Sequence, residues 1–283
     1  MSALVAGLVL SVATLQEPPV FRAEVGLVRV EVLVTRSGVP VHGLSTADFQ
    51  VRDDGRLREL EPVLEEESPV DAVLVLDMSG SVRGPKLDAL KDAARAFLDG
   101  LHQGEQAALL AFREEVHLLQ PFTPDYALVR RALGEASSRG STALCDAVYA
   151  ALRLREPGPR RTAVVVFSDG LDNLSWLAPE EVIQAASRSD AIVYGVAARE
   201  RGEKGESFLQ NVCQATGGRL FETRSERDIR ARFLDVLADI RSRYVLSFNP
   251  GPGVAGWHSL DVRLKRAKGD VLARPGYWRS STP

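Results

Sequence analysis

The chain has 283 residues, of which 45% are hydrophobic and 26% charged, and its formal net charge is −3 at pH 7. This is the composition of a globular protein with enough chain for one large core and a smaller one. The slightly acidic balance, the lack of a Lys or Arg run and the 6% of aromatic residues argue against nucleic acid or an anionic membrane as a partner.

The chain begins with the apolar stretch MSALVAGLVLSVATLQEPP, which has about the length of a signal-peptide core and then turns polar. It is too short to span a bilayer as a stable helix. One feature of signal peptides is missing, namely the usual Lys or Arg before the apolar run. We expect residues 1–19 to be a secretory signal peptide. The alternative is a frayed, partly buried N-terminal segment. No later stretch is long and apolar enough for a transmembrane helix.

A β pattern follows over residues 20–66. VGLVRVEVLVT alternates apolar and polar residues, as a half-buried strand does. The Asp54-Gly55 pair between FQVR and RLREL predicts a tight hairpin. This segment therefore predicts a small antiparallel unit.

Residues 70–242 have a different pattern. Short apolar runs without alternation (AVLVLD, QAALLAF, RTAVVVFSD, AIVYGVAA) are typical of strands buried on both faces. Helical patterns lie between them, REEVHLL predicts a short edge strand, and Ser225 is a candidate N-cap of the last helix, over about 226–242. Alternating strands and helices predict a doubly wound, mostly parallel α/β sheet of about six strands with helices on both faces.

Strand patterns return over residues 243–279. YVLSFNP, WHSLDVRLK and DVLARPGYW predict three strands, and we expect Trp257 and Trp278 to pack in their core. Three strands alone are a weak domain. We therefore expect 20–66 and 243–279 to pair into one discontinuous β-sandwich domain, with the α/β domain inserted in it.

Oxygen-bearing side chains follow the apolar runs of the α/β region. Asp77-x-Ser79-x-Ser81 ends the first strand, Thr142 opens a helix, and Asp169 ends the strand AVVVF. Ligands of open parallel sheets bind beyond the C-terminal ends of the strands, so these five side chains can converge there. Such oxygens suit a hard divalent cation, Mg²⁺ or Mn²⁺. A cation held mainly by neutral hydroxyls keeps positive charge that attracts an external carboxylate.

The segments DMSGS, GST and SDG resemble the metal-ion-dependent adhesion site (MIDAS) of von Willebrand factor type A domains. The family's ligand pattern falls on Asp77, Ser79, Ser81, Thr142 and Asp169, and the resemblance covers about residues 70–242. The flanking β segments resemble those of bacterial secreted proteins called VWFA-related. The resemblance implies a secreted, periplasmic or cell-envelope protein. It also implies that the cation docks an exposed Asp or Glu of a partner protein. Cys145 departs from the family, where an aromatic residue is expected.

Two other functions stay open. One is a metal-stabilised structural scaffold of the cell envelope. The other is a phosphatase of the haloacid-dehalogenase type, which also has an Asp after its first strand. That chemistry needs a second Asp two residues later as acid and base, and Ser79 stands there instead. We therefore expect a binding module and no enzyme.

The remaining candidates have simpler interpretations. Cys145 and Cys213 are expected to be buried thiols, with a disulfide still possible. Asp172 and Asn173 are expected to stabilise their loop. The histidines are expected to be structural or exposed. The last helix leads into YVLSF without Gly or Pro, so its movement would pull on the β segment. In relatives that switch, the final helix moves when the metal site changes its ligands; a rigid joint is the alternative.

Overall fold

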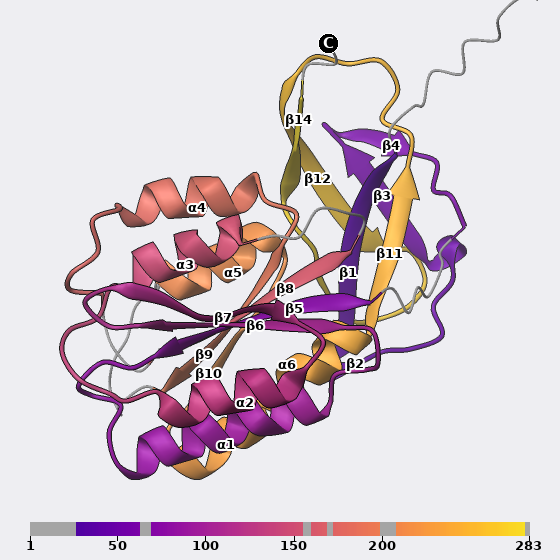
Figure 1. The fold of residues 1–283 in the computed structure, drawn as a ribbon. Helices are drawn as coiled ribbons and strands as arrows, with labels where there is room; N and C mark the ends of the chain where they lie inside the picture. The colour runs from indigo at the N-terminus through magenta and orange to yellow at the C-terminus, as the bar shows by residue number, and fades with distance from the viewer. Residues whose placement is uncertain (1–26, 63–68, 155–159, 169–171, 199–207, 281–283) are drawn as a thin grey trace, which may run out of the picture.

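The structure, a computed structural model, describes residues 27–62, 69–154, 160–168, 172–198 and 208–280 (Figure 1). The expected signal peptide at 1–19 and the candidate ligand Asp169 lie outside the described residues. Within the described ranges, no helix combines the length and the apolar character that a membrane span needs.

A six-stranded sheet forms the centre, in the order β10-β9-β8-β5-β6-β7. All neighbours in it are parallel except β7, which runs antiparallel to β6. The strands are β5 (Val70–Asp77), β6 (Gln106–Phe112), β7 (Val116–Thr123), β8 (Arg161–Ser168), β9 (Ile192–Ala198) and β10 (Leu220–Thr223). Every residue of β5 is buried, because helices cover both faces of a central parallel strand. The edge strand expected at 113–119 is present as β7, which begins and ends a few residues later in the chain.

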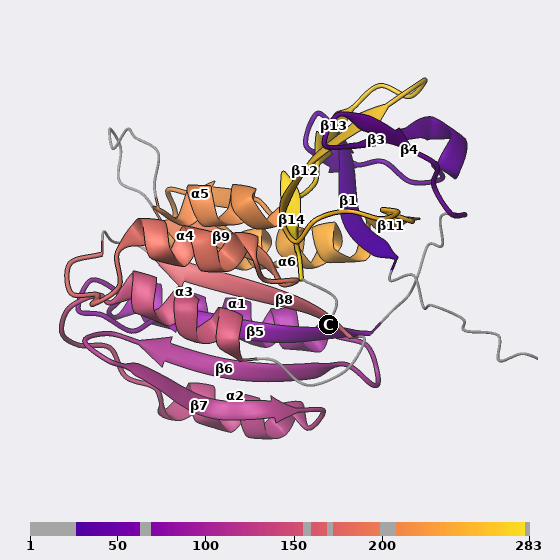
Figure 2. The same cartoon turned by 90° about the horizontal axis from the view of Figure 1, so that it is seen from above.

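Helices pack on both faces of this sheet, which confirms the doubly wound arrangement (Figures 1 and 2). One face carries α1 (Pro85–Asp99), α2 (Tyr126–Glu135) and α6 (Glu226–Arg241); the other carries α3 (Leu144–Arg153), α4 (Pro179–Ser187) and α5 (Phe208–Thr216). The hydroxyl of Ser225 accepts a hydrogen bond from the Arg227 N–H, so Ser225 caps α6 as predicted.

The N-terminal and C-terminal β segments pair with each other. In one sheet β1 (Val28–Arg36) lies between β11 (Arg243–Phe248) and β13 (Asp270–Leu272), and β2 (Val39–Pro40) also pairs with β1. The other sheet has the order β14-β12-β3-β4, formed by β14 (Gly276–Arg279), β12 (Gly256–Leu264), β3 (Phe49–Asp53) and β4 (Arg56–Arg58). A 3-10 turn, Thr46–Asp48, precedes β3. One hydrophobic cluster contains residues of both sheets. The division into domains at 20–66, 70–242 and 243–279 stays a prediction.

The hairpin predicted at Asp54-Gly55 joins β3 to β4. Asp54 has a φ of 48° and Gly55 a φ of 76°, the left-handed conformations of a two-residue type I′ turn. Gly tolerates this conformation without strain, and Asp is among the residues that adopt it most readily. The hairpin predicted from the Asp54-Gly55 pair is therefore confirmed.

The strand predicted over DVLARPGYW was wrong as a single element. It divides into β13, which pairs with β1, and β14, which pairs with β12. Pro275 lies between them; it has no N–H to donate, and its carbonyl accepts from the Leu260 N–H at 2.8 Å. The chain thus changes sheets at the proline.

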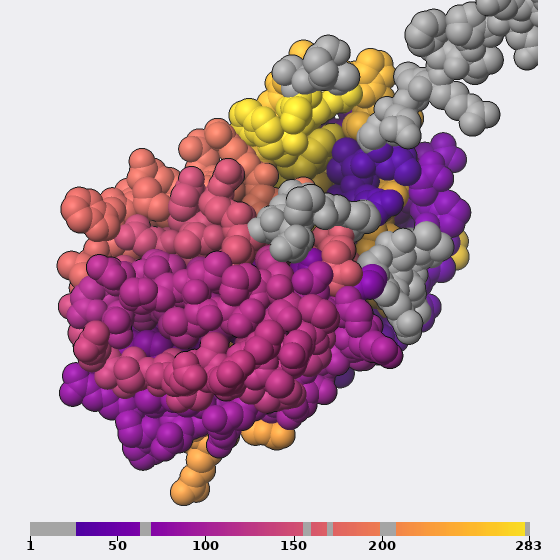
Figure 3. Space-filling model, in the orientation of Figure 1, coloured from indigo at the N-terminus to yellow at the C-terminus, as the bar shows by residue number. Residues whose placement is uncertain are grey.

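The expectation that Trp257 and Trp278 pack in the core was also wrong, because they are 42% and 46% exposed. They lie opposite each other in the β12–β14 pair, and the adjacent pair, His258 and Tyr277, is buried and stacked instead. Arg188, which follows α4, lies over the Trp278 ring at 4.4 Å. In the space-filling view, the yellow C-terminal strands accordingly lie directly beside the α4 region (Figure 3).

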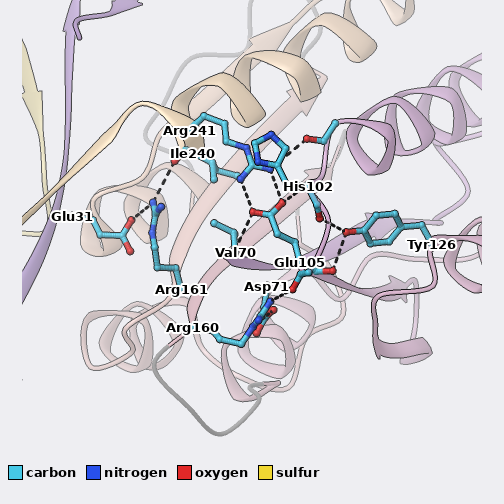
Figure 4. A network of polar contacts seen from close by, with 12 residues as sticks. Glu31, Val70, Asp71, His102, Glu105, Tyr126, Arg160, Arg161, Ile240 and Arg241 are labelled. Carbon is cyan, nitrogen blue, oxygen red and sulfur yellow. Dashed lines mark hydrogen bonds and ion pairs between the residues drawn. The ribbon is translucent and has the colours of Figure 1, made fainter. Parts of the chain in front are cut away.

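The β segments lie at the end of the central sheet where its parallel strands begin, so the strands run away from them (Figure 1). Only Ser242 separates α6 from β11. A polar network joins the two parts there (Figure 4): Arg161, the first residue of β8, donates to the Glu31 carboxylate of β1 at 2.5 Å. The C-terminal edge of the sheet, where ligands of this fold class bind, is the opposite end of the molecule.

Candidate metal centre

Asp77 is the last residue of β5, and its carboxylate organises the loop that follows. The side chain is fully buried. Its Oδ1 accepts from the Ser79 N–H at 2.8 Å, and its Oδ2 accepts from the Ser168 hydroxyl at 2.9 Å. Ser168 is the last residue of β8, the neighbouring strand. One carboxylate therefore holds the ends of two parallel strands together at the sheet edge.

The hydroxyls of Ser79 and Ser81 are hydrogen-bonded to each other, with their Oγ atoms 3.0 Å apart. Ser79 is buried and Ser81 is exposed, so this pair of oxygens lies where the core opens to solvent. The sequence pattern explains the arrangement: once Asp77 caps the Ser79 N–H, the following turn brings the side chain of Ser81 back beside Ser79.

Backbone hydrogen bonds fasten the loop that carries Thr142 to this turn. The Gly80 N–H donates to the Gly140 carbonyl at 2.9 Å, and the Arg139 N–H donates to the Met78 carbonyl at 2.8 Å. A Cβ on Gly80 would lie 3.1 Å from the Gly140 carbonyl oxygen and 2.8 Å from the Arg83 guanidinium. A glycine at position 80 thus permits the close approach of the two loops. Thr142 itself is buried.

The third loop follows β8, and its described part begins at Asp172. The Asn173 Oδ1 accepts from the Thr142 N–H at 2.9 Å, and the Asn173 N–H donates to the Thr142 carbonyl at 3.1 Å. The Asp172 carboxylate accepts from the N–H groups of Cys145 and Ser175 at 2.7 and 3.0 Å. Asp172 and Asn173 therefore stabilise the loop, as predicted.

Hydrogen bonding also sets the charge state of Asp172. Burial opposes ionisation, but the hydrogen bonds from Ser175 and from the Cys145 N–H outweigh it, so the pKa of Asp172 lies below its ordinary value. The loop consequently keeps a fixed negative charge next to the first turn of α3 at neutral pH.

The structure brings Asp77, Ser79 and Ser81 together and ties the backbone of Thr142 to the same edge. Their donor set fits a hard cation in chemistry and in spacing. Two adjacent ligands of an octahedral Mg²⁺ at about 2.1 Å lie about 3.0 Å from each other, and the two serine hydroxyls have this separation. The sequence interpretation overlooked Ser168, the hydroxyl that holds Asp77. The available signal was its position as the last residue of a buried strand, directly before Asp169.

A second group of possible ligand atoms lies in the β segments, formed by Asp53, Asp54 and His258. These atoms are already engaged with protein groups. His258 Nδ1 is 2.8 Å from an Asp54 oxygen and Nε2 is 2.9 Å from the Val254 carbonyl, while Asp53 accepts from Arg58 at 2.7 and 3.0 Å. This group stabilises the hairpin corner and gives His258 the structural role expected of it.

The two cysteines are free and buried, as expected. Both lie in the hydrophobic cluster between the sheet and the helices α3, α4 and α5. Burial and the hydrogen bond with Asp172 raise the pKa of the Cys145 thiol to about 12. Burial likewise raises the pKa of Cys213. Neither thiol has the thiolate character that metal binding or nucleophilic chemistry requires.

Comparisons with known proteins agree with this fold. The family model described as von Willebrand factor type A domain matches residues 72–171. The chain is similar to a solved "von Willebrand factor type A" structure from Catenulispora acidiphila, with 17% identity, 87% of this chain and 75% of that chain covered, and a TM-score of 0.54. No curated protein matches the chain.

Two further solved structures are similar. One is the vWF domain of the type V pili tip protein Mfa5 from Porphyromonas gingivalis, with 14% identity, 61% of this chain and 95% of that chain covered, and a TM-score of 0.50. The other is proximal thread matrix protein 1 from the mussel byssus with a zinc-occupied MIDAS motif, with 18% identity, 65% and 48% covered, and a TM-score of 0.53. At these identities the likeness shows a common fold. Residues 72–171 thus match the von Willebrand factor type A family model, and the chain shares the fold of solved type A domains.

Proposed function

We propose that this protein is a metal-dependent protein-binding module. In this proposal Asp77, Ser79, Ser81, Thr142 and Asp169 hold one Mg²⁺ or Mn²⁺, directly or through water, at the C-terminal edge of the central sheet. The observation that carries the proposal is the pair of serine hydroxyls, 3.0 Å apart beside a buried carboxylate that is already fixed by hydrogen bonds.

The charge of this donor set favours docking. Ser79, Ser81 and Thr142 contribute neutral oxygens, so the cation keeps positive charge that an Asp or Glu of a partner protein can neutralise. Ser81 is exposed, which leaves the cation accessible from solvent. A phosphatase of the haloacid-dehalogenase type needs a second Asp as general acid two residues after the first. Ser79 occupies that place in this chain.

The metal proposal is tested by isothermal titration of the purified protein with MgCl₂ and MnCl₂. We expect saturable binding by the wild type and by Ser137→Ala, which changes an exposed hydroxyl elsewhere in the α2–α3 loop. We expect binding to be lost in Asp77→Ala and weakened at least about tenfold in Ser79→Ala, while circular dichroism shows unchanged helix content. Equal metal affinity in Asp77→Ala and the wild type would refute the assignment.

The binding proposal is separated from a metal-stabilised scaffold by a pull-down from a cell-envelope fraction with and without EDTA. A docking module loses partners when the metal is removed. A scaffold keeps the same partners and loses only thermal stability. The proposed location outside the cytoplasm is supported by the apolar run at residues 1–19 and is tested by N-terminal sequencing of the mature protein, which should begin near residue 20.

A further inference from the structure

An apolar surface lies on the loop next to the proposed metal centre. The indole of Trp176 is 94% exposed, and Leu174, two residues earlier, is 45% exposed. Large aromatic side chains are normally buried over most of their area, because burying each one removes about 150–250 Å² of apolar surface from water. We call Leu174 and Trp176 the apolar rim.

The backbone under this rim is held firmly. The N–H groups of Trp176 and Leu177 both donate to the Asp146 carboxylate, at 3.0 Å each. Asp172 accepts from the Leu174 N–H at 3.2 Å and from the Ser175 hydroxyl at 2.5 Å. Two carboxylates thus fix the loop while its apolar side chains point to solvent. A fixed backbone with an exposed aromatic side chain is pre-organised for binding, since little entropy is lost when a partner covers it.

The rim is close to the proposed cation. Asn173 is hydrogen-bonded to Thr142 through both its side chain and its backbone. Trp176 follows Asn173 by three residues, so their Cα atoms are within about 11 Å of each other even if the chain is fully extended. Asp146, which holds Trp176, lies in the first turn of α3, which begins two residues after Thr142.

Two arginines belong to the segments that form the proposed centre. The Arg83 guanidinium lies against Gly80, inside the Asp77-x-Ser79-x-Ser81 turn. Arg139, whose backbone N–H donates to the Met78 carbonyl, is exposed. With the cation, these groups favour an acidic ligand, while the rim favours an apolar one.

We infer that the partner is a protein segment that carries an Asp or Glu and, two to four residues away, a bulky apolar side chain. The carboxylate binds the cation and the apolar side chain covers Trp176 and Leu174. The spacing follows from the reach of an extended chain, which is about 3.3–3.6 Å per residue. This inference rests on the proposed metal-dependent function and specifies the kind of segment that it recognises.

The test uses a displayed library of linear peptides with one fixed central Asp and random flanking residues, selected on the full wild-type chain in MgCl₂ and eluted with EDTA. We expect the enriched peptides to carry an aromatic or large aliphatic residue two to four positions from the Asp. Trp176→Ser should bind these peptides at least about tenfold more weakly, as expected for an aromatic anchor. Its affinity for MgCl₂ should remain that of the wild type.

Val254→Ser is the control, because Val254 is 78% exposed and belongs to the loop before β12, in the β segments. It should bind the peptides like the wild type. Enriched peptides that need Mg²⁺ but show no apolar preference, or that bind Trp176→Ser equally well, would overturn the inference and leave the metal-dependent function intact. Peptide binding that is insensitive to EDTA and to Asp77→Ala would overturn both. Self-association of the wild type in ultracentrifugation that Trp176→Ser abolishes would identify a second copy as the occupant and would also overturn the inference.

Discussion

The carboxylate of Glu105 fastens the start of the central sheet to the end of α6, and its removal tests how strongly this joint is held. Glu105 is 2% exposed. It accepts from both terminal nitrogens of Arg241 at 2.5 Å, from the Val70 N–H at 3.1 Å and from the His102 N–H at 2.7 Å (Figure 4). One side chain thus joins the first residue of β5, the loop after α1 and the last residue of α6.

Glu105→Ala should be strongly destabilising. It leaves a guanidinium and two backbone N–H groups without their acceptor, and removing one partner of a buried ion pair costs about 3–5 kcal/mol. The Arg241 side chain is 26% exposed, so water can solvate part of the released charge. We therefore expect the lower end, about 3 kcal/mol, which corresponds to a fall in Tm of about 6–12 °C for a chain of this size.

The pH dependence gives a second test of the same pair. Burial opposes ionisation of Glu105, but the hydrogen bonds from Arg241, His102 and Val70 outweigh it, so its pKa lies below the ordinary 4.5. A carboxyl group with a lowered pKa contributes stability that is fully present above its unfolded pKa and is lost as the pH falls through its folded pKa. The difference in stability between the wild type and Glu105→Gln should therefore shrink as the pH is lowered below about 4.

Thermal unfolding followed by circular dichroism measures both effects. Asp99→Asn is the control, because Asp99 pairs with Arg130 at 2.5 Å while their side chains are 66% and 38% exposed. That exposed pair should contribute less than about 1 kcal/mol. If Glu105→Ala unfolded within about 1 kcal/mol of the wild type, the reasoning that this network holds the end of α6 would be refuted.

Three further predictions concern the last helix and the core. Burial raises the pKa of Asp239, in the last turn of α6, to about 6, because the Arg219 guanidinium 3.4 Å away offsets the effect of burial only in part. Because protonation then favours the folded state, Asp239→Asn should be more stable than the wild type by about 2 kcal/mol at pH 8, with the gain vanishing near pH 4 in denaturant titrations; no gain at pH 8 would contradict this. Cys145 and Cys213 should react with a thiol reagent only after unfolding in guanidinium, and rapid labelling of the native protein would show that they are accessible. Hydrogen exchange with MgCl₂ and an acidic peptide should alter protection only in the loops around Asp77 and Thr142, since the Arg241 network favours a rigid joint; changes in α6 and β11 together would instead show that the helix switches.

Much of the fold followed from local sequence patterns. Buried parallel strands such as β5 are continuously apolar, and the Asp-Gly turn and the Ser225 cap are specified by their own residues. The grouping of Asp77, Ser79 and Ser81 was also predictable, because residues two apart after one strand are confined to one turn. That Asp169 joins this group stays a prediction from the sequence.

Contacts between distant residues were decided only by the tertiary structure. Glu105 and Arg241 are 136 residues apart, and neither belongs to a motif. Ser168 reaches Asp77 only because β8 pairs with β5. Alternation along β12 and β14 determines that each Trp points away from its His or Tyr neighbour. It does not determine which of the two faces is covered: the second sheet packs on the side of His258 and Tyr277, so the tryptophans remain exposed.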